Sequence, residues 1–306
     1  MLATVAVTAS AATVQAAVTP PAISTGGVRA VGYASAVLTG AINPHTSNTS
    51  YYFQYGPTAA YGQQTGVADL HGGSSAVTVS IPVSGLQPIT KYHYRLIAVN
   101  AAGASTGADK SFTTKKAPLS LQILASPNPV LFGSPAIVQG TLSGTGNGSR
   151  TVVLQANPFP YTAGFTNVGN PELTTPTGGF SFPILGLTQA TQLRVTTLTK
   201  PAVVSPVALE GVAVRIHARV KRTSRPNHPR IYGTVTPAVD GMQVAFMRVT
   251  RGRDVLVSGT SLKHRNATSS RFSRVVHINK RGLYRVLVRV TNGAQTSNYS
   301  SPLRIR

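Results

Sequence analysis

Residues 86–103 of the chain read LQPITKYHYRLIAVNAAG, and this stretch decides the fold. It is rich in aromatic and branched apolar residues, with Pro88 in its first turn and Gly103 at its end. Short runs of this kind, bounded by Pro, Gly and Asn, are typical of strands in β-sandwiches and β-barrels. Similar alternating runs surround it at residues 36–42, 51–55, 77–81 and 111–114.

The composition extends this prediction to the whole chain. The 306 residues suffice for two or three domains of ordinary size, and they include 29 Gly and 21 Pro. No window of useful length has a helical period, so we expect an all-β fold. The chain contains no Cys, which excludes disulfides and thiolate metal sites.

Residues 20–114 resemble a fibronectin type III domain. The resemblance rests on Leu86-x-Pro88-x-Thr90-x-Tyr92, on Tyr94-Arg95, on Ala98-Val99-Asn100-x-x-Gly103 and on Ser111-Phe112-Thr113-Thr114. It implies a seven-stranded sandwich in which Tyr92 forms the tyrosine corner, with its hydroxyl bonded to backbone near the preceding turn. The core Trp that is usual in this family is absent, and Leu38 lies in the strand that would carry it.

The remainder contains a weak internal repeat with a period near 93 residues. The matching pairs are Gly140-Thr-Leu with Gly233-Thr-Val, Phe180-Ser with Phe272-Ser, Leu193-Arg-Val with Tyr284-Arg-Val, and Ser205-Pro with Ser301-Pro. Residues 118–212 and 213–306 therefore resemble two bacterial immunoglobulin-like sandwich domains. Short linkers between all three domains predict an elongated rod.

Positive charge is concentrated in the last predicted domain. The chain has a formal net charge of +22, and residues 213–306 contain nineteen Lys and Arg but only two Asp. Residues 118–212 contain only three basic side chains, so a codon bias toward Arg does not explain the excess. Uncompensated charge of this density favours a polyanionic partner, although a solvated charged face without a partner remains an alternative.

The alternation of residues predicts which cations would meet that partner. Basic residues from 215 to 221 alternate with apolar ones, and a similar pattern recurs around residues 285–289. We expect the polyanion-binding residues to be Arg215, Arg219, Lys221, Arg222, Arg285 and Arg289.

The same sequence gives little support for catalysis. The six carboxylates are scattered, and the nearest pair in one domain, Asp240 and Asp254, lies among turn residues. The seven His lack metal-ligand spacing, and no nucleophile motif is present. We therefore expect no enzyme activity, no cofactor and no metal.

Residues 1–19 are predicted to be a signal-like or disordered N-terminus, and no apolar run is long enough to span a bilayer. The leading hypothesis is an exported bacterial scaffold or adhesion protein, secreted or on the cell surface, whose basic domain docks to an anionic envelope polymer or polysaccharide. Nucleic acid ranks lower because no binding motif occurs. A protein partner of the first domain remains open.

Two alternative functions stay open. The chain could be the non-catalytic part of a secreted enzyme, or an accessory carbohydrate-binding protein. The second alternative requires exposed aromatic platforms, for which Tyr52, Tyr61 and Tyr161 are the candidates.

Overall fold

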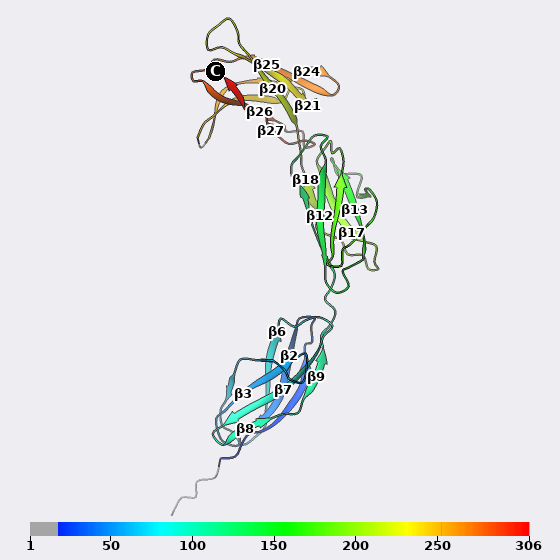
Figure 1. Cartoon of the computed structure of the whole chain (residues 1–306), viewed down its shortest axis with the longest axis vertical. Coiled ribbons are helices and arrows are strands. Elements are labelled where there is room, and N and C mark those ends of the chain that lie inside the picture. Colours follow the sequence, from blue (N-terminus) through cyan, green and yellow to red (C-terminus); the bar gives the residue numbers. More distant parts are fainter. Residues whose placement is uncertain (1–17, 252, 306) are drawn as a thin grey trace, which may run out of the picture. The chain divides into compact units, whose positions relative to one another are not determined.

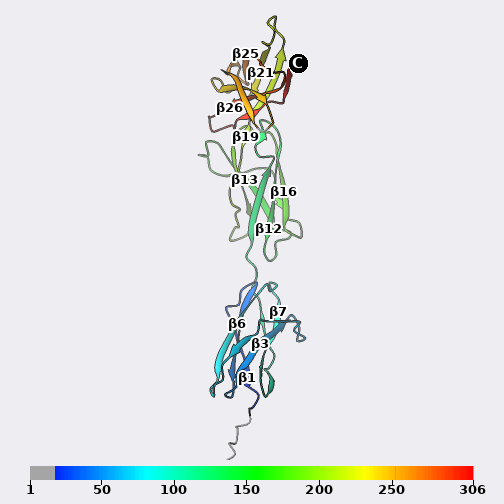
Figure 2. The same cartoon turned by 90° about the vertical axis from the view of Figure 1, so that its left-hand side faces the viewer.

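A computed structural model describes residues 18–251 and 253–305. Within these ranges every regular element is a β-strand, which confirms the all-β prediction (Figures 1 and 2). Of the predicted N-terminal segment 1–19, residues 1–17 lie outside the described residues. The chain divides into two compact units, residues 1–117 and 118–306.

The first unit is one sandwich of two antiparallel sheets. The first sheet contains β1 (Ala22–Arg29), β2 (Ser35–Asn43) and β6 (Val77–Ser84) in the order β1-β2-β6. The second sheet pairs β3 (Thr49–Gly56) with β7 (Lys91–Asn100), flanked by β4 (Gln63–Gln64), β5 (Ala68–Leu70), β8 (Gly103–Thr106) and β9 (Lys110–Thr113). Three strands against a larger sheet built on β3 and β7 is a fibronectin type III-like arrangement.

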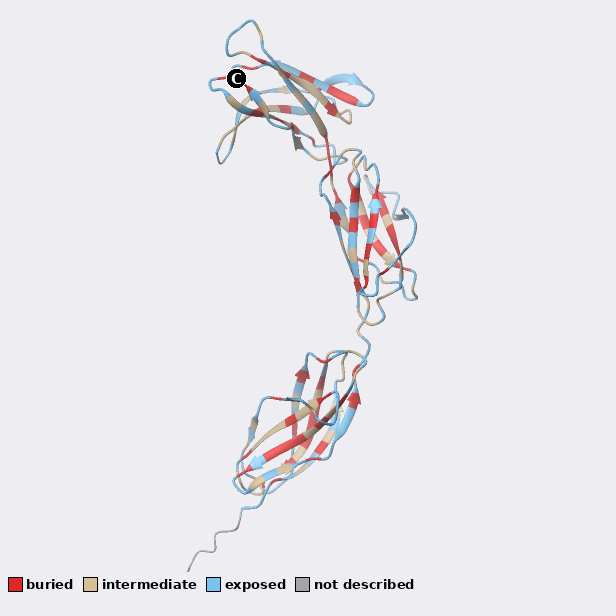
Figure 3. Ribbon diagram, viewed as in Figure 1, coloured by how far each residue is buried: buried red, intermediate tan, exposed pale blue. Residues whose placement is uncertain are grey.

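Alternation along the central strands builds the core of this sandwich. In β7 the side chains of Tyr92, Tyr94, Leu96 and Ala98 are all buried, as the period of two requires. Leu38 is fully buried in β2, the strand in which the fibronectin type III resemblance leads us to expect a Trp. Figure 3 shows the same alternation of buried and exposed positions along the strands.

Tyr92 lies at the start of β7 and faces the preceding turn. Its hydroxyl accepts a hydrogen bond from the backbone N–H of Gln87 at 3.0 Å, and its ring stacks on Phe112 at a centroid distance of 5.8 Å. This is the geometry that a tyrosine corner requires, because the ring is buried while its polar end remains satisfied.

The second unit begins with another sandwich. One sheet has the order β10 (Ser120–Ser126), β12 (Ala136–Ser143), β16 (Gly179–Ile184). The other contains β13 (Thr151–Pro158), β14 (Thr166–Asn167), β15 (Glu172–Leu173), β17 (Thr191–Thr197) and β18 (Ala208–Glu210), with β13 and β17 paired at its centre. Its core includes Leu121, Val138, Leu154 and Phe182.

A last sandwich completes the second unit. One sheet has the order β20 (Arg215–Lys221), β21 (Arg230–Thr236), β25 (Ser269–Val275), β24 (Lys263–Asn266). The other contains β22 (Gln243–Val249), β23 (Asp254–Ser261), β26 (Gly282–Arg289), β27 (Asn298–Tyr299) and β28 (Leu303–Ile305). Phe246, Phe272 and Tyr284 fill its core.

A short parallel pair joins the last two sandwiches. Strand β11 (Val130–Leu131) pairs with β19 (Val212–Ala213), and Val130, Ala136 and Val212 form a buried cluster beside the pair. The predicted boundary between residues 212 and 213 therefore falls inside a strand that both sandwiches share. This pairing explains why residues 118–306 form one compact unit.

The glycine and the phenylalanine of the internal repeat face each other on adjacent strands. Gly140 of β12 is directly opposite Phe180, and Gly233 of β21 is directly opposite Phe272. In both places a Cβ atom on the glycine would overlap the facing phenylalanine ring. In both sandwiches the glycine thus leaves room for the phenylalanine ring of the neighbouring strand.

The final repeat match differs from the sequence alignment by one residue. Ser205 accepts a hydrogen bond from the Val195 N–H through its hydroxyl oxygen, and Ser300 does the same for Val286. Ser300, rather than Ser301, is therefore the counterpart of Ser205. The Ser-Pro dipeptides aligned because the last sandwich has one extra residue before its proline.

Candidate polyanion-binding surface

The outward face of the sheet β20-β21-β25-β24 has an unusual concentration of positive charge. Along β20, Ile216, Ala218 and Val220 pack against the core. The intervening His217, Arg219 and Lys221 are exposed on the opposite face. The predicted alternation of apolar and basic residues is therefore present in the structure.

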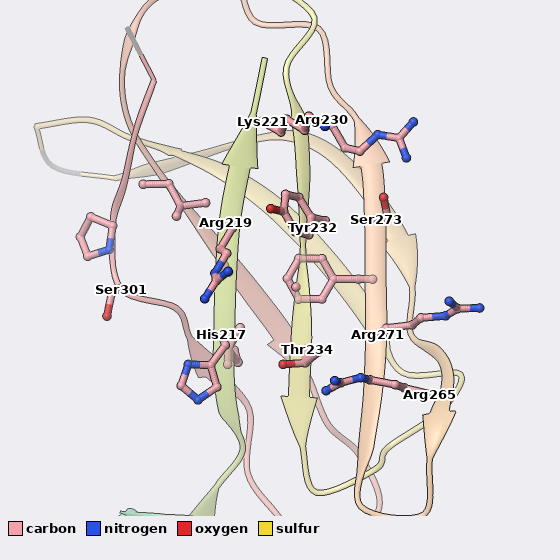
Figure 4. A pocket seen from close by; sticks show the side chains of 16 residues that line it. His217, Arg219, Lys221, Arg230, Tyr232, Thr234, Arg265, Arg271, Ser273 and Ser301 are labelled. Carbon is pink, nitrogen blue, oxygen red and sulfur yellow. The ribbon is translucent and has the colours of Figure 1, made fainter. Parts of the chain in front are cut away.

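The strand register adds cations from two further strands to this face. Directly opposed residues in antiparallel strands project from the same side of a sheet. One row runs from His217 through Thr234 to Arg271, and the next from Arg219 through Tyr232 to Ser273. Figure 4 shows these side chains standing along three adjacent strands.

These residues line a shallow groove with a volume of about 1020 Å³. We call it the basic groove and define it by the residues that carry its chemistry: His217, Arg219, Lys221, Arg230, Tyr232, Arg265 and Arg271. No carboxylate is among its lining residues. Within residues 18–251 and 253–305, no ion pair involves a side chain of the groove. Its charge is thus available to an external anion.

Tyr232 lies in the middle of the groove. It is half-buried and is the direct cross-strand neighbour of both Arg219 and Ser273. A tyrosine in this position presents part of a ring and a hydroxyl beside a guanidinium. The groove therefore combines its cations with one partly exposed aromatic ring.

The six predicted polyanion-binding residues are distributed over different parts of the last sandwich. Arg219 and Lys221 lie in the basic groove. Arg222 lines a separate cavity at the end of β20. Arg289 is exposed on β26, in the other sheet.

The remaining two predicted residues already have partners. The guanidinium of Arg215 donates hydrogen bonds to the Phe132 carbonyl at 3.0 Å and to the Ser134 hydroxyl at 2.8 Å, across the shared junction. Arg285 pairs with the Asp254 carboxylate, and its guanidinium carbon lies 3.9 Å from the centre of the Tyr299 ring. Both arginines therefore have structural contacts that an incoming anion would have to displace.

Five of the seven residues that define the groove were not among the predicted polyanion-binding residues: His217, Arg230, Tyr232, Arg265 and Arg271. The signal that points to Arg230 and Tyr232 is the alternation of residues 230–234, in which Ile231 is buried between two outward positions. Arg271 alternates with the buried Phe272 in the same way. What the sequence lacks is the information that these strands are neighbours.

Two polar clusters invite comparison with catalytic triads. In one, the Asp240 carboxylate accepts hydrogen bonds from Ser270 and from His264 Nδ1, the latter at 3.0 Å. These bonds, the one from Ser270 first, hold the pKa of Asp240 below its usual range. The carboxylate lies between the hydroxyl and the imidazole, so the histidine is not placed to take the serine proton.

The second cluster lies on the first sandwich and has the same order of groups. Asp109 accepts hydrogen bonds from His93 Nδ1 at 2.8 Å and from the Tyr61 hydroxyl at 2.9 Å. The bond from His93 is the main reason that the pKa of Asp109 is lowered. In the described ranges no three His, Asp or Glu side chains gather as a metal site.

None of the predicted aromatic platforms is an exposed ring. Tyr52, Tyr61 and Tyr161 are each half-buried. The Tyr61 ring is covered by Arg95 at 4.6 Å, and Tyr161 packs edge-on against Phe159 at 5.6 Å. Among the described residues, no helix has the length and apolar character needed to cross a bilayer.

Comparison with known proteins identifies no family. No protein-family model matches the chain, and no curated protein matches it significantly. Among solved structures, the chicken CNTN1 FN1–FN3 domains are 17% identical over 94% of this chain and 97% of theirs, with a TM-score of 0.30. Titin domains A168–A170 are 12% identical over 94% and 99%, with a TM-score of 0.35.

A marsupial T cell receptor is 12% identical over 93% of this chain and 99% of its own, with a TM-score of 0.29. Scores this low carry no functional information. The function proposed below therefore rests on the side chains of the last sandwich.

Proposed function

We propose that the chain is a non-enzymatic scaffold or adhesion protein, exported to a bacterial surface or to the extracellular space, and that it docks to an anionic envelope polysaccharide through the basic groove. The observation that supports this proposal is the groove itself. It gathers Arg219, Lys221, Arg230, Arg265 and Arg271 around one open surface without a carboxylate. Such a surface attracts polyanions and repels other cations.

The form of the groove favours a polymer over a small ion. Its cations come from several adjacent strands and are spaced across the sheet, so a ligand must extend over several strands to meet them all. Arginine forks bind carboxylate, phosphate and sulfate groups through paired hydrogen bonds. Single-stranded nucleic acid binders use several stacking rings, whereas the Phe and Tyr rings that line this groove are the buried Phe272 and the half-buried Tyr232.

The test compares the whole chain with two double variants that lose the same charge. Arg219→Ala with Arg271→Ala removes two groove cations. Arg251→Ala with Arg289→Ala removes two exposed cations from the opposite sheet and its hairpin. Binding to purified acidic polysaccharide, to its neutral counterpart and to DNA is measured over a series of salt concentrations.

We expect the groove variant to lose roughly 10- to 100-fold in affinity for the acidic polysaccharide, because charge-assisted contacts contribute about 1.5–3 kcal/mol each and exposed ones less. The slope of log affinity against log salt should become about two units shallower. The control variant should lose much less. Equal losses in both variants, or tighter binding of DNA than of polysaccharide, would overturn the proposal.

A further inference from the structure

A second cationic cavity lies at one end of the last sandwich, apart from the residues that define the basic groove. The β20–β21 loop, the segment before β26 and strand β28 enclose a volume of about 520 Å³. We call it the arginine pocket and define it by Arg222, Arg225, His228, Arg281 and Arg304, which all line it. Among the residues that the structure describes, no Asp or Glu lines it.

The walls of this pocket are held by their own hydrogen bonds. The Thr223 hydroxyl donates to the His228 carbonyl at 2.6 Å, which closes the β20–β21 loop on itself. The Ile278 N–H then donates to the Asn227 carbonyl at 2.9 Å and ties the loop to the neighbouring segment. A loop fixed in this way loses little conformational entropy when a ligand binds.

Two buried isoleucines beneath the pocket and the side chain of His228 also help to fix its walls. Ile278 and Ile305 are buried beneath the pocket, so the loop stands on the apolar core. The Nδ1 atom of His228 donates to the Pro226 carbonyl at 2.7 Å, and the His228 ring packs against His277 at a centroid distance of 4.6 Å. The imidazole is therefore held in one orientation at the wall of the pocket.

The four guanidinium groups of the pocket lack internal partners. Among residues 18–251 and 253–305, no ion pair or hydrogen bond involves the guanidinium of Arg222, Arg225, Arg281 or Arg304. By contrast, Arg215 and Arg285 in the same sandwich are satisfied by protein acceptors. Four unsatisfied arginines around one small cavity repel each other, and an anion would relieve that repulsion.

We propose that the arginine pocket binds one compact tetrahedral oxyanion group, of the phosphate or sulfate type. The planar guanidinium fork donates two parallel hydrogen bonds to such a group, and several forks can surround its oxygens. The volume lies in the range of small-ligand sites and is about half that of the basic groove. A terminal or substituent group fits this space better than the length of a polymer.

This site is independent of the proposed docking function, because the defining residues of the two surfaces do not overlap. The group could reach the pocket as a free ion or as the monoester end of a larger molecule. Both sources share the same chemistry, and the choice of probes distinguishes them.

The experiment titrates the full-length protein with inorganic phosphate, inorganic sulfate and methyl phosphate at constant ionic strength, with nitrate as the monovalent control. Binding is followed by calorimetry and by the NMR signals of the arginine side chains. We expect saturable binding with one site per chain. Methyl phosphate binding as well as inorganic phosphate would assign the pocket to an esterified end group, whereas binding of the inorganic ions alone would assign it to free oxyanions.

Three variants make the assignment specific. Arg225→Ala with Arg281→Ala should weaken binding at least ~10-fold, since two charge-assisted contacts are lost. Arg225→Lys with Arg281→Lys keeps the charge but loses the forks, so it should weaken binding by an intermediate factor. The groove variant Arg219→Ala with Arg271→Ala should bind as the unmodified chain does.

All four arginines are exposed, so these variants should fold, and their melting temperatures check this. A linear, unsaturable response, or equal weakening by the pocket and groove variants, would mean that the ions only screen the surface charge. Either result would overturn the proposal.

Discussion

One arginine in each of the three sandwiches makes the same pair of contacts. Arg95 donates to Gln54 at 2.8 Å and covers Tyr61 at 4.6 Å, and Arg194 donates to Gln155 at 2.8 Å and covers Phe165 at 4.1 Å. In the last sandwich Arg285 binds Asp254 and covers Tyr299. In each sandwich the arginine holds an aromatic ring against the outer face of the central strands through a cation–π contact.

This pair of contacts distinguishes arginines with a structural role from arginines whose guanidinium is available to a ligand. From the sequence, Arg285 and Arg289 look equivalent, because both alternate with apolar residues of β26. The distinction depends on Asp254, which lies 31 residues earlier in the chain. A partner this distant cannot be located without knowing which strands are neighbours.

The protonation state of the Glu210 carboxyl group should affect the stability of the second unit. Its side chain is fully buried at the junction. One carboxylate oxygen accepts a hydrogen bond from the Val130 N–H at 3.1 Å, and the other has no partner among the described residues. Burial raises its pKa from 4.5 to about 7, and the bond from Val130 only partly opposes this.

The direction of the pH dependence follows from this pKa. Between pH 4.5 and about 7 the unfolded chain ionises Glu210 while the folded chain keeps it protonated. The stabilisation is therefore complete below the unfolded pKa and is lost as the pH rises to about 7. The loss should amount to roughly 3 kcal/mol, at about 1.4 kcal/mol per pKa unit.

Glu210→Gln should remove this pH dependence while leaving an oxygen to accept the Val130 N–H. Denaturant unfolding of both proteins from pH 4 to pH 8 measures the effect. We expect the free energy of unfolding to fall more steeply with pH in the unmodified chain. Parallel curves would show that Glu210 ionises freely in the folded state.

At the scale of single elements, the alternation of side chains was the feature that could be predicted. Burial of one face of the sheet imposes a period of two along β2, β7 and β20. The alternation of apolar and polar residues therefore predicts these strands from the sequence. The pairing of strands was not predictable in the same way. The short strands β11 and β19, with two residues each, have no period to recognise.

The glycines of the central strands give an element-scale prediction. Gly140→Ala would place a methyl group against the Phe180 ring and the Gln122 carbonyl, so β12 must shift away from its neighbours. Overpacking of this kind costs about 1–3 kcal/mol. Gly66→Ala, where a Cβ would meet no atom within 4 Å, is the control.

Thermal unfolding followed by calorimetry measures both variants. We expect Gly140→Ala to lower the melting temperature of the second unit only. Gly66→Ala should leave both melting temperatures within about 1 °C of those of the unmodified chain, since a surface change of this kind alters stability little. An unchanged melting temperature in Gly140→Ala would mean that the repeat glycine is not required by packing.

At the scale of the whole molecule, the two compact units should unfold separately, because each has its own buried cores. Calorimetry of the full chain should show two transitions rather than three, since β11 and β19 join the last two sandwiches. Arg215→Ala removes two hydrogen bonds across that junction. This variant should lower only the melting temperature of the second unit. The expected decrease is roughly 2–4 °C, which corresponds to a loss of about 1 kcal/mol in the free energy of unfolding.

Three independent transitions in the unmodified chain, or a shift of both transitions in Arg215→Ala, would contradict this description. The predicted fold class agrees with the three sandwiches of the structure, and the boundary predicted between residues 212 and 213 lies within β19. The parallel pair cannot be predicted from local sequence, because it links residues more than 80 positions apart.

The β11–β19 pair also determines how the second unit would respond to tension. The chain enters the last sandwich through β19, and Val130 and Phe132 donate backbone hydrogen bonds of 2.9 and 2.8 Å to Gly211 and Ala213. If the last sandwich is anchored and the rest of the chain is pulled, the force is carried by these bonds and by the Arg215 contacts as well as by the covalent chain. The junction would then work as a mechanical coupling that resists extension until its hydrogen bonds break.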